Sequence, residues 1–145
     1  AVLQTSMTLL HLADRAARHR GTPHRTGMLL TASSAVMSPG ERADAHAGTD
    51  AVGVEMEGYW LGEVAKRANV PFLAVRAISD VAADAIPPYV AAAANGGLAQ
   101  QIRQIAPGVI RRPADLPTIV RLAAYARLAS KNLARFVEAF LDELT

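Results

Sequence analysis

The feature that most constrains this fold is a helical stretch between two apolar segments, all within residues 51–79. Residues 51–56 (AVGVEM) and 71–79 (PFLAVRAIS) are nearly continuous in apolar residues, as expected of strands covered on both faces. Residues 57–69 between them have the pattern of a helix, long enough for the crossover that parallel strands need. The order strand–helix–strand therefore predicts an α/β fold with a parallel sheet.

Two further elements precede this unit. Leucines and alanines recur at helical spacing through residues 2–20, which predicts a helix. Residues 26–37 form an apolar run that predicts one bulged strand or two short strands. Ser38 and Glu41 form a capping-box pattern, and a short helix should extend from it to about Ala47.

The chain changes character after the second apolar segment. Residues 88–106 are expected to form two short helices, because Gly96 and Gly97 interrupt the helical pattern. Prolines then mark a linker, and residues 117–144 form a long amphipathic pattern. We divide the chain into a partial α/β domain, a Pro-rich linker and a C-terminal amphipathic helix, at residues 1–106, 107–116 and 117–145.

The apolar stripe of the C-terminal helix is predicted from its spacing to comprise Ile119, Leu122, Ala126, Ala129, Leu133, Phe136, Phe140 and Leu144. Arg127, Lys131 and Arg135 follow each other at a spacing of four residues on another side. This basic row either is solvated while the stripe packs on the domain or a partner, or meets anionic lipid headgroups in a peripheral membrane contact.

Composition excludes several classes of function. The 145 residues suffice for one ordinary domain, and the net charge of +2 is too small to indicate a nucleic-acid partner. No cysteine is present, so disulfides and thiolate nucleophiles are excluded, and we predict a cytoplasmic location. No apolar run has the length of a membrane span, and the four histidines show no metal-ligand spacing.

Acidic residues lie where the two predicted strands of residues 51–79 end. Glu55 and Glu57 are at the carboxyl end of the first, and Asp80 is at the carboxyl end of the second. Ligands of open parallel sheets bind beyond these ends. Converging carboxyl groups suit a reaction with a cationic transition state and a leaving group that must be protonated.

Three motifs in this region resemble the purine nucleoside phosphorylase and methylthioadenosine/S-adenosylhomocysteine nucleosidase superfamily. They are VEMEG at residues 54–58, VPF at 70–72 and RAISD at 76–80, and the resemblance covers about residues 26–84. It implies part of a three-layer α/β fold, with a helical C-terminal extension here, and cleavage of the N-glycosidic bond of a purine nucleoside. Whether phosphate or water attacks stays open, and so do the base and the 5′ substituent.

The resemblance also implies roles for individual residues. Glu57 matches the glutamate that accepts hydrogen bonds from the ribose 2′- and 3′-hydroxyls, and Met56 matches a methionine packed against the sugar. Asp80 matches the catalytic acid that assists departure of the base at N7, for which a raised pKa is needed. Ser79 is expected to orient Asp80.

The remaining predicted substrate-binding residues have less defined roles. Glu55 is either structural or in contact with substrate, and Arg76 is expected to be an ion-pair partner more than a direct ligand. Val36 is placed near the base, next to Ala35, where nucleosidases of this type usually carry a stacking aromatic residue. We interpret Tyr59 and Trp60 as core or interface residues more than substrate contacts.

One expected part of the family's site has no counterpart in this sequence. The strands and glycine-rich loops that bind phosphate or activate water do not precede residues 1–20. The chain is therefore expected to be partial, with the N-terminal half of the site missing. We predict no metal or organic cofactor, with phosphate as the candidate co-substrate, and a homo-oligomer by analogy with relatives.

Two other functions stay open. A chain without the attacking half of the site could be a non-catalytic nucleoside-binding module or an inactive fragment of such an enzyme. Alternatively, the tail (IPPYV, the Pro-rich segment and the basic helix) resembles phosphorylase-like proteins of squalene and hopanoid synthesis. That branch includes a nucleosidase that removes adenine from adenosylhopane.

Overall fold

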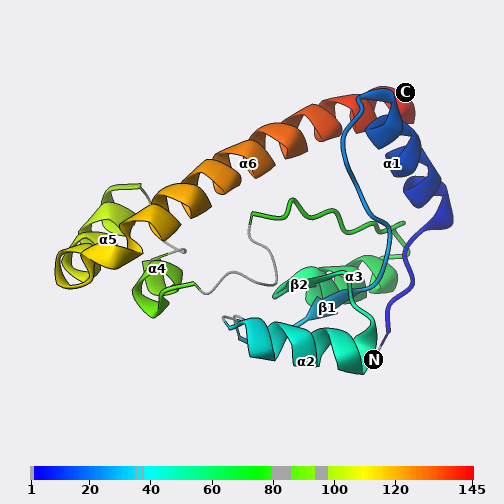
Figure 1. Ribbon diagram of the computed structural model, residues 1–145. Coiled ribbons are helices and arrows are strands. Elements are labelled where there is room, and N and C mark those ends of the chain that lie inside the picture. Colours follow the sequence, from blue (N-terminus) through cyan, green and yellow to red (C-terminus); the bar gives the residue numbers. More distant parts are fainter. Residues whose placement is uncertain (1, 35, 37, 80–85, 94–97) are drawn as a thin grey trace.

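The protein is a mostly helical α/β chain with a small parallel sheet, seen in a computed structural model that describes residues 2–34, 36, 38–79, 86–93 and 98–145 (Figure 1). Strands β1 (Leu29–Thr31) and β2 (Gly53–Glu55) pair in parallel, with Thr31 opposite Glu55. The connection between them is α2 (Pro39–Thr49). The predicted α/β class is confirmed in this coarse form, with strands shorter than expected.

Helix α2 begins as its sequence predicts. The Ser38 side chain accepts a hydrogen bond from the backbone of Glu41, and the Glu41 carboxylate accepts one from the backbone N–H of Ser38 at 2.9 Å. This capping box satisfies backbone donors at the helix start. The helix ends at Asp50, whose φ of 55° is left-handed and turns the chain back into β2.

The strand predicted for residues 71–79 is absent from the described sheet, so that prediction is wrong. The segment follows α3 (Gly58–Arg67) as an extended coil. The Phe72 carbonyl accepts hydrogen bonds from the N–H of Ser6 at 2.8 Å and from the hydroxyl of Thr5 at 3.2 Å. The segment is therefore tied to the N-terminal stretch, and the parallel crossover of the described strands runs through α2 rather than α3.

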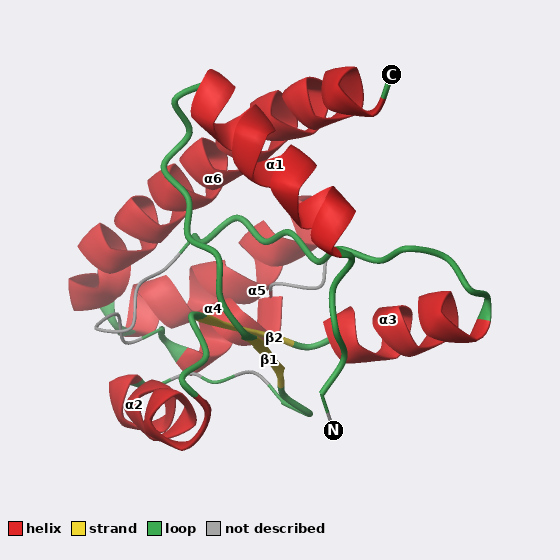
Figure 2. Cartoon of the chain, turned by 90° about the vertical axis from the view of Figure 1, so that its right-hand side faces the viewer, coloured by secondary structure: helices red, strands yellow, loops and turns green. Residues whose placement is uncertain are grey.

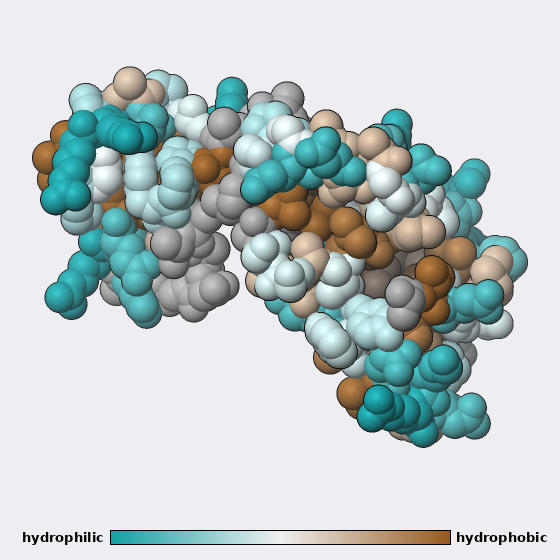
Figure 3. Space-filling model, turned by 90° about the horizontal axis from the view of Figure 1, so that it is seen from below, coloured by the Kyte–Doolittle hydropathy of each residue, from teal (hydrophilic) through white to brown (hydrophobic). Residues whose placement is uncertain are grey.

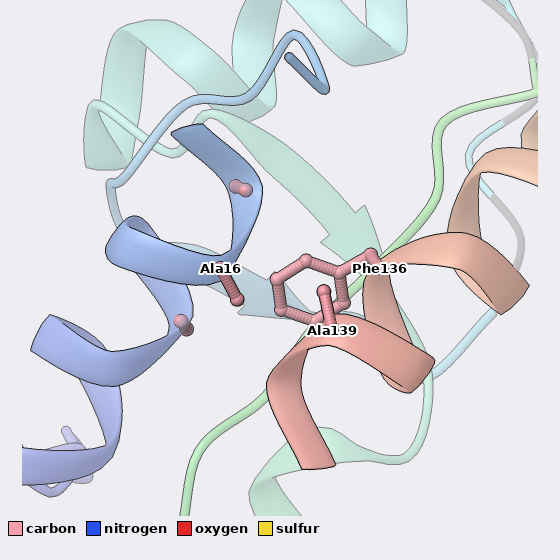
Figure 4. Packing of buried hydrophobic residues seen from close by; sticks show 5 residues of the cluster. Ala16, Phe136 and Ala139 are labelled. Atoms are coloured by element: carbon pink, nitrogen blue, oxygen red, sulfur yellow. The ribbon is translucent and has the colours of Figure 1, made fainter. Parts of the chain in front are cut away.

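A pair of helices far apart in sequence forms the main apolar cluster. Helix α1 (Met7–His19) follows its N-cap Ser6 and begins five residues later than predicted. It crosses the end of α6 (Leu116–Leu144) (Figure 2). Figure 4 shows Phe136 and Ala139 of α6 facing Ala16 of α1. Small residues on α1 let the helices approach closely, and the Phe136 ring fills the space between them.

Three shorter elements lead into α6. Helices α4 (Pro88–Ala93) and α5 (Leu98–Arg111) confirm the predicted pair, and a 3-10 turn (Pro113–Asp115) follows them. Residues 107–111 are helical rather than irregular, since Pro107 lies inside α5. A Cβ on Gly108 would lie 2.5 Å from the Tyr89 ring, so glycine is what allows α4 and α5 to pack this closely. The domain division proposed at residue 106 stays a prediction.

The predicted apolar stripe of α6 is buried over only part of its length. Ala129 and Phe136 are buried, and four members are half-buried: Ile119, Leu122, Leu133 and Phe140. The others, Ala126 and Leu144, are exposed. In Figure 1 this helix spans from α5 to α1, and it is the end next to α1 that packs.

Much apolar surface is left uncovered. The chain exposes 10272 Å², whereas a compact protein of its mass exposes about 7,100 Å². Among the described residues, Phe136 is the only large apolar side chain that is buried, and the other buried apolar residues are alanines. Figure 3 shows hydrophobic residues gathered around a hollow on one face. Within the described ranges, no helix combines the length and the hydropathy that crossing a membrane requires.

Candidate functional site

The candidate site lies where β1 and β2 end and α3 begins. The parallel register brings Thr31 beside Glu55, and Glu57 directly precedes the first turn of α3. Arg76 reaches the same place from the coil after α3. We call Thr31, Glu55, Glu57 and Arg76 the polar cluster.

Glu55 is the centre of this cluster and is only 8% exposed. Its carboxylate accepts hydrogen bonds from the Arg76 guanidinium at 2.6 Å and from the backbone N–H of Glu57 at 2.9 Å. The Thr31 hydroxyl and the backbone N–H of Gly58 also donate to it. A Cβ on Gly58 would lie 2.9 Å from this carboxylate, so glycine is required for α3 to begin so close to it.

These contacts keep Glu55 ionised. Burial acts to raise the pKa of its carboxyl group, but the hydrogen bonds from Thr31, Arg76 and the start of α3 outweigh it and lower the pKa to about 2. The positive end of the α3 dipole also favours a negative charge here. Glu55 therefore acts as a fixed anion that joins three segments of the chain. Of the two roles considered for Glu55, structural or in contact with substrate, this arrangement favours the structural one.

Thr31 is a member that the sequence interpretation missed. Its hydroxyl donates to Glu55 and accepts from the backbone N–H of Tyr59 at 3.0 Å, so it links β1 to the first turn of α3. The sequence feature that could have identified Thr31 is its hydroxyl at the carboxyl end of an apolar run, directly before the small residues that interrupt this run. The parallel register that places it opposite Glu55 was not predicted.

Glu57 differs from Glu55 in its surroundings. Its side chain is 68% exposed, and one oxygen lies 3.5 Å from the Arg76 guanidinium. Arg76 thus lies between the two glutamates, as its predicted ion-pair role requires. Met56, between the glutamates in sequence, is also exposed. Glu57 and Met56 are therefore accessible to a ligand from outside.

The other predicted site residues stand differently. Asp80 lies outside the described residues, as does Ala35. Ser79 and Val36 are both half-buried. The Val36 carbonyl accepts a hydrogen bond from the Arg42 side chain at 3.3 Å. The substrate-binding roles of these residues stay predictions.

Two hollows adjoin the polar cluster. The larger, about 1180 Å³, lies between the α1–α6 pair, residues 22–31 and the coil of residues 72–78. The smaller, about 340 Å³, is lined by Thr31, Ala32, Ser33, Met56, Tyr59 and Trp60. Tyr59 and Trp60 meet edge to face, with ring centroids 5.2 Å apart, and Trp60 is 67% exposed. The exposure of Trp60 places it outside the described core, and the choice between an interface and a substrate contact stays a prediction.

Acidic and histidine side chains of the described ranges form no group of three that could hold a metal ion. His24 and Asp14 pair at 2.8 Å beside the larger hollow, away from the strand ends. The chemistry that the polar cluster offers is thus that of carboxylates and one guanidinium.

A family model described as the phosphorylase superfamily matches residues 3–142 of the chain. The match extends beyond residues 26–84, to which the motifs point, and includes both α1 and most of α6. Comparison with curated proteins and with solved structures gave no match.

Proposed function

Because the chain belongs to the phosphorylase superfamily, we propose that it takes part in cleaving the N-glycosidic bond of a purine nucleoside. Activity of the nucleoside phosphorylase or nucleosidase type is what membership suggests. The choice of a purine and the roles of individual residues are our own proposal, and they rest on the polar cluster.

The observation that carries this proposal is the contrast between Glu55 and Glu57. Glu55 is buried, and its carboxylate accepts hydrogen bonds from Thr31, Arg76 and the backbone N–H groups of Glu57 and Gly58. The last two bonds position the backbone at the start of α3. Glu57 is thereby held at a defined place while its carboxylate projects outward. A carboxylate so placed can accept hydrogen bonds from both vicinal hydroxyls of a ribose. It also favours the positive charge that develops on the sugar ring as the bond to the base breaks.

The remaining roles complete the proposal. Asp80 assists departure of the base, Ser79 orients Asp80, and Met56 and Val36 contact the substrate. Arg76 orients Glu57. The full site in this proposal belongs to a three-layer α/β sheet, of which β1 and β2 are the described strands. Phosphate is a candidate co-substrate and water is the alternative.

The test is release of free base from purine nucleosides, measured with and without inorganic phosphate. Release only with phosphate identifies a phosphorylase, and release without it identifies a hydrolase. Glu57→Gln is expected to lower kcat/KM about a hundredfold, since it removes a charge that acts in the transition state. Glu63→Gln, on the same helix, is the matched control and should leave kcat/KM unchanged. Asp80→Asn should lower turnover much more than binding.

Two alternatives predict other results in the same assay. Binding of a nucleoside without release of base identifies a non-catalytic module or an inactive fragment. Release of adenine from a nucleoside with a large apolar 5′ substituent, but not from adenosine, identifies a nucleosidase of the hopanoid type. The exposed apolar residues of α6 beside the basic row support this second alternative.

We also propose a cytoplasmic location and association with a second copy of the chain. The surface area in excess of a compact protein supports self-association, because covering it would bury apolar side chains. Light scattering after size-exclusion chromatography tests this, and a monomer at all concentrations would contradict it. Peripheral membrane contact through Arg127, Lys131 and Arg135 predicts retention on anionic vesicles that is lost in salt.

A further inference from the structure

We propose that one side of α6 docks onto an anionic membrane surface, with Leu116, Val120 and Leu128 as the side chains that enter the lipid. The contact extends the one proposed above for the basic row, and it does not depend on the glycosidic reaction. The apolar residues concerned differ from the predicted stripe of α6, part of which packs within the protein.

The docking side consists of two rows in which successive residues are four apart. An apolar row, which we call the outer row, is followed by the basic row, and their members are Leu116, Val120, Ala124 and Leu128, then Arg127, Lys131 and Arg135. Each basic residue follows a member of the outer row by seven residues, and residues seven apart on a helix lie on one side. We call the two rows together the outer face.

The outer face is accessible along its whole length. All seven side chains are exposed, and the fractions for Leu116, Val120 and Leu128 are 48%, 60% and 57%. In Figure 1 the outer row lies on the part of α6 that is next to α5 and away from α1. Packing with α1 involves Phe136 and Ala139, which belong to neither row. The outer face is therefore a surface that the described fold does not use.

The part of the chain that carries this face is strongly basic. Residues 98–135, which contain α5, the 3-10 turn and most of α6, have seven basic side chains and one acidic side chain. Their net charge is thus +6, and since the whole chain carries +2, the other residues carry −4. The acidic residue, Asp115, accepts a hydrogen bond from the Tyr89 hydroxyl at 2.8 Å. Positive charge concentrated in one part of a protein favours an anionic partner.

The apolar side chains beside these charges favour a membrane over a nucleic acid. Proteins contact the nucleic-acid backbone mainly through basic and polar groups, which leaves a row of exposed aliphatic side chains without a role. A helix that lies on a bilayer uses both kinds of residue. Its apolar side chains enter the boundary between headgroups and acyl chains, while its Lys and Arg side chains meet the anionic headgroups.

The first experiment measures binding of the intact chain to vesicles by flotation. The vesicles contain phosphatidylcholine and phosphatidylserine in equal parts, or phosphatidylcholine alone. We expect binding to the anionic vesicles that weakens as salt is raised, and little binding to the neutral ones. Equal binding to both kinds of vesicle, or binding to neither, would overturn the proposal.

The basic row is tested with two variants that lose the same charge. Combining Arg127→Gln, Lys131→Gln and Arg135→Gln should weaken binding about a hundredfold, because each basic residue near an anionic surface contributes about fivefold. The control combines Arg25→Gln, Lys66→Gln and Arg67→Gln, which are exposed residues outside the basic part of the chain. It should bind nearly as the native chain does. Equal losses would show that net charge, rather than the outer face, determines binding.

The outer row is tested with a matched pair of Val and Leu residues. Val120→Ser with Leu128→Ser should weaken binding about tenfold, because the aliphatic surface that enters the lipid is lost. Leu61→Ser with Val64→Ser changes an exposed Leu and an exposed Val of α3 and should leave binding unchanged. Circular dichroism confirms that each variant is folded. Equal effects of the two pairs would contradict insertion through the outer row.

The absence of cysteine from the chain allows a dye to be attached at one chosen position. An environment-sensitive dye on Val120→Cys is expected to shift its emission to the blue when anionic vesicles are added, and the same dye on Val64→Cys is expected to show no shift. A shift at both positions, or at neither, would overturn the assignment of the inserting residues.

Other occupants of the outer face give different results. Binding to a DNA duplex that requires the basic row but not Val120 and Leu128, with no binding to vesicles, would assign the face to nucleic acid. Self-association that the Val120→Ser and Leu128→Ser pair abolishes, again with no binding to vesicles, would assign it to a second copy of the chain. Either result would overturn the proposal.

These measurements contain no nucleoside, so they separate membrane docking from the proposed reaction. Vesicle binding that depends on both rows, without base release from any nucleoside, would support docking while the reaction fails. Base release by a chain that does not bind anionic vesicles would overturn docking and leave the reaction standing.

Discussion

The polar cluster and the α1–α6 helix pair hold the molecule together by different means. In the cluster, one buried carboxylate binds three segments through directional hydrogen bonds. In the helix pair, alanines of α1 and α6 pack around Phe136, with ion pairs such as Arg15–Glu143 at the exposed edge. The comparison indicates that site geometry and fold stability depend on separable interactions. The predictions below test that separation.

The largest effect is expected from Phe136→Ala in the helix pair. Removing this ring leaves a cavity among alanines too small to fill it, and should lower the free energy of unfolding by about 3–4 kcal/mol. Urea denaturation measures the change. Val137→Ala, at the exposed neighbouring position, is the control and should cost less than about 1 kcal/mol. Equal losses in the two variants would show that Phe136 is not the centre of the core.

Glu55→Gln is expected to have the next largest effect. It leaves Arg76 and the backbone donors at the start of α3 without a charged partner, at a cost of about 2–3 kcal/mol. Glu57→Gln should cost under about 0.5 kcal/mol, because Glu57 is exposed. Glu55→Gln should therefore lose more stability than Glu57→Gln. If Glu57 has the proposed role, Glu57→Gln should nevertheless lose more activity in the base-release assay than Glu55→Gln.

Acid should weaken the polar cluster through Glu55. The folded pKa of Glu55 is lowered to about 2, so its contribution to stability is complete above its unfolded value and is lost as the pH falls from about 4.5 towards 2. The stability difference between the native chain and Glu55→Gln should therefore shrink over this window. A difference that stays constant from pH 6 to pH 2.5 would contradict the lowered pKa.

The smallest effect is expected at His24, which ties residues 22–24 to α1. Its ring forms hydrogen bonds with the Asp14 carboxylate at 2.8 Å and with the Thr22 carbonyl at 2.9 Å. These bonds raise the pKa of His24 above the usual value, although the positive charge of the nearby Arg18 acts to lower it. A raised pKa means that the contribution is present below about pH 6.5 and is lost as the pH rises through the folded value. We expect Tm to fall by about 1–2 °C across this range, and His24→Gln to remove the change.

Local signals in the sequence predicted local structure well. The capping box of Ser38 and Glu41 forms as expected, and α4 and α5 are separate helices. Wrong predictions arose where a distant partner decides the outcome. Residues 71–79 have the composition of a strand, but the Phe72 carbonyl bonds to Ser6, which is 66 residues away in sequence. Residues 107–111 are helical although Pro107 begins them, and the division of the chain at residue 106 stays a prediction.

The sequence by itself determined the family, through the VEMEG, VPF and RAISD motifs, and it identified Glu55, Glu57 and Asp80 as candidate site residues. The resemblance implied a ribose-binding role for Glu57, but it left Glu55 open between a structural role and contact with substrate. Only the tertiary structure decided that Glu55 is buried and Glu57 accessible. The groups that bury and ionise Glu55 come from Thr31 and Arg76, 24 and 21 residues away, and burial is a property of the packed chain rather than of its local sequence.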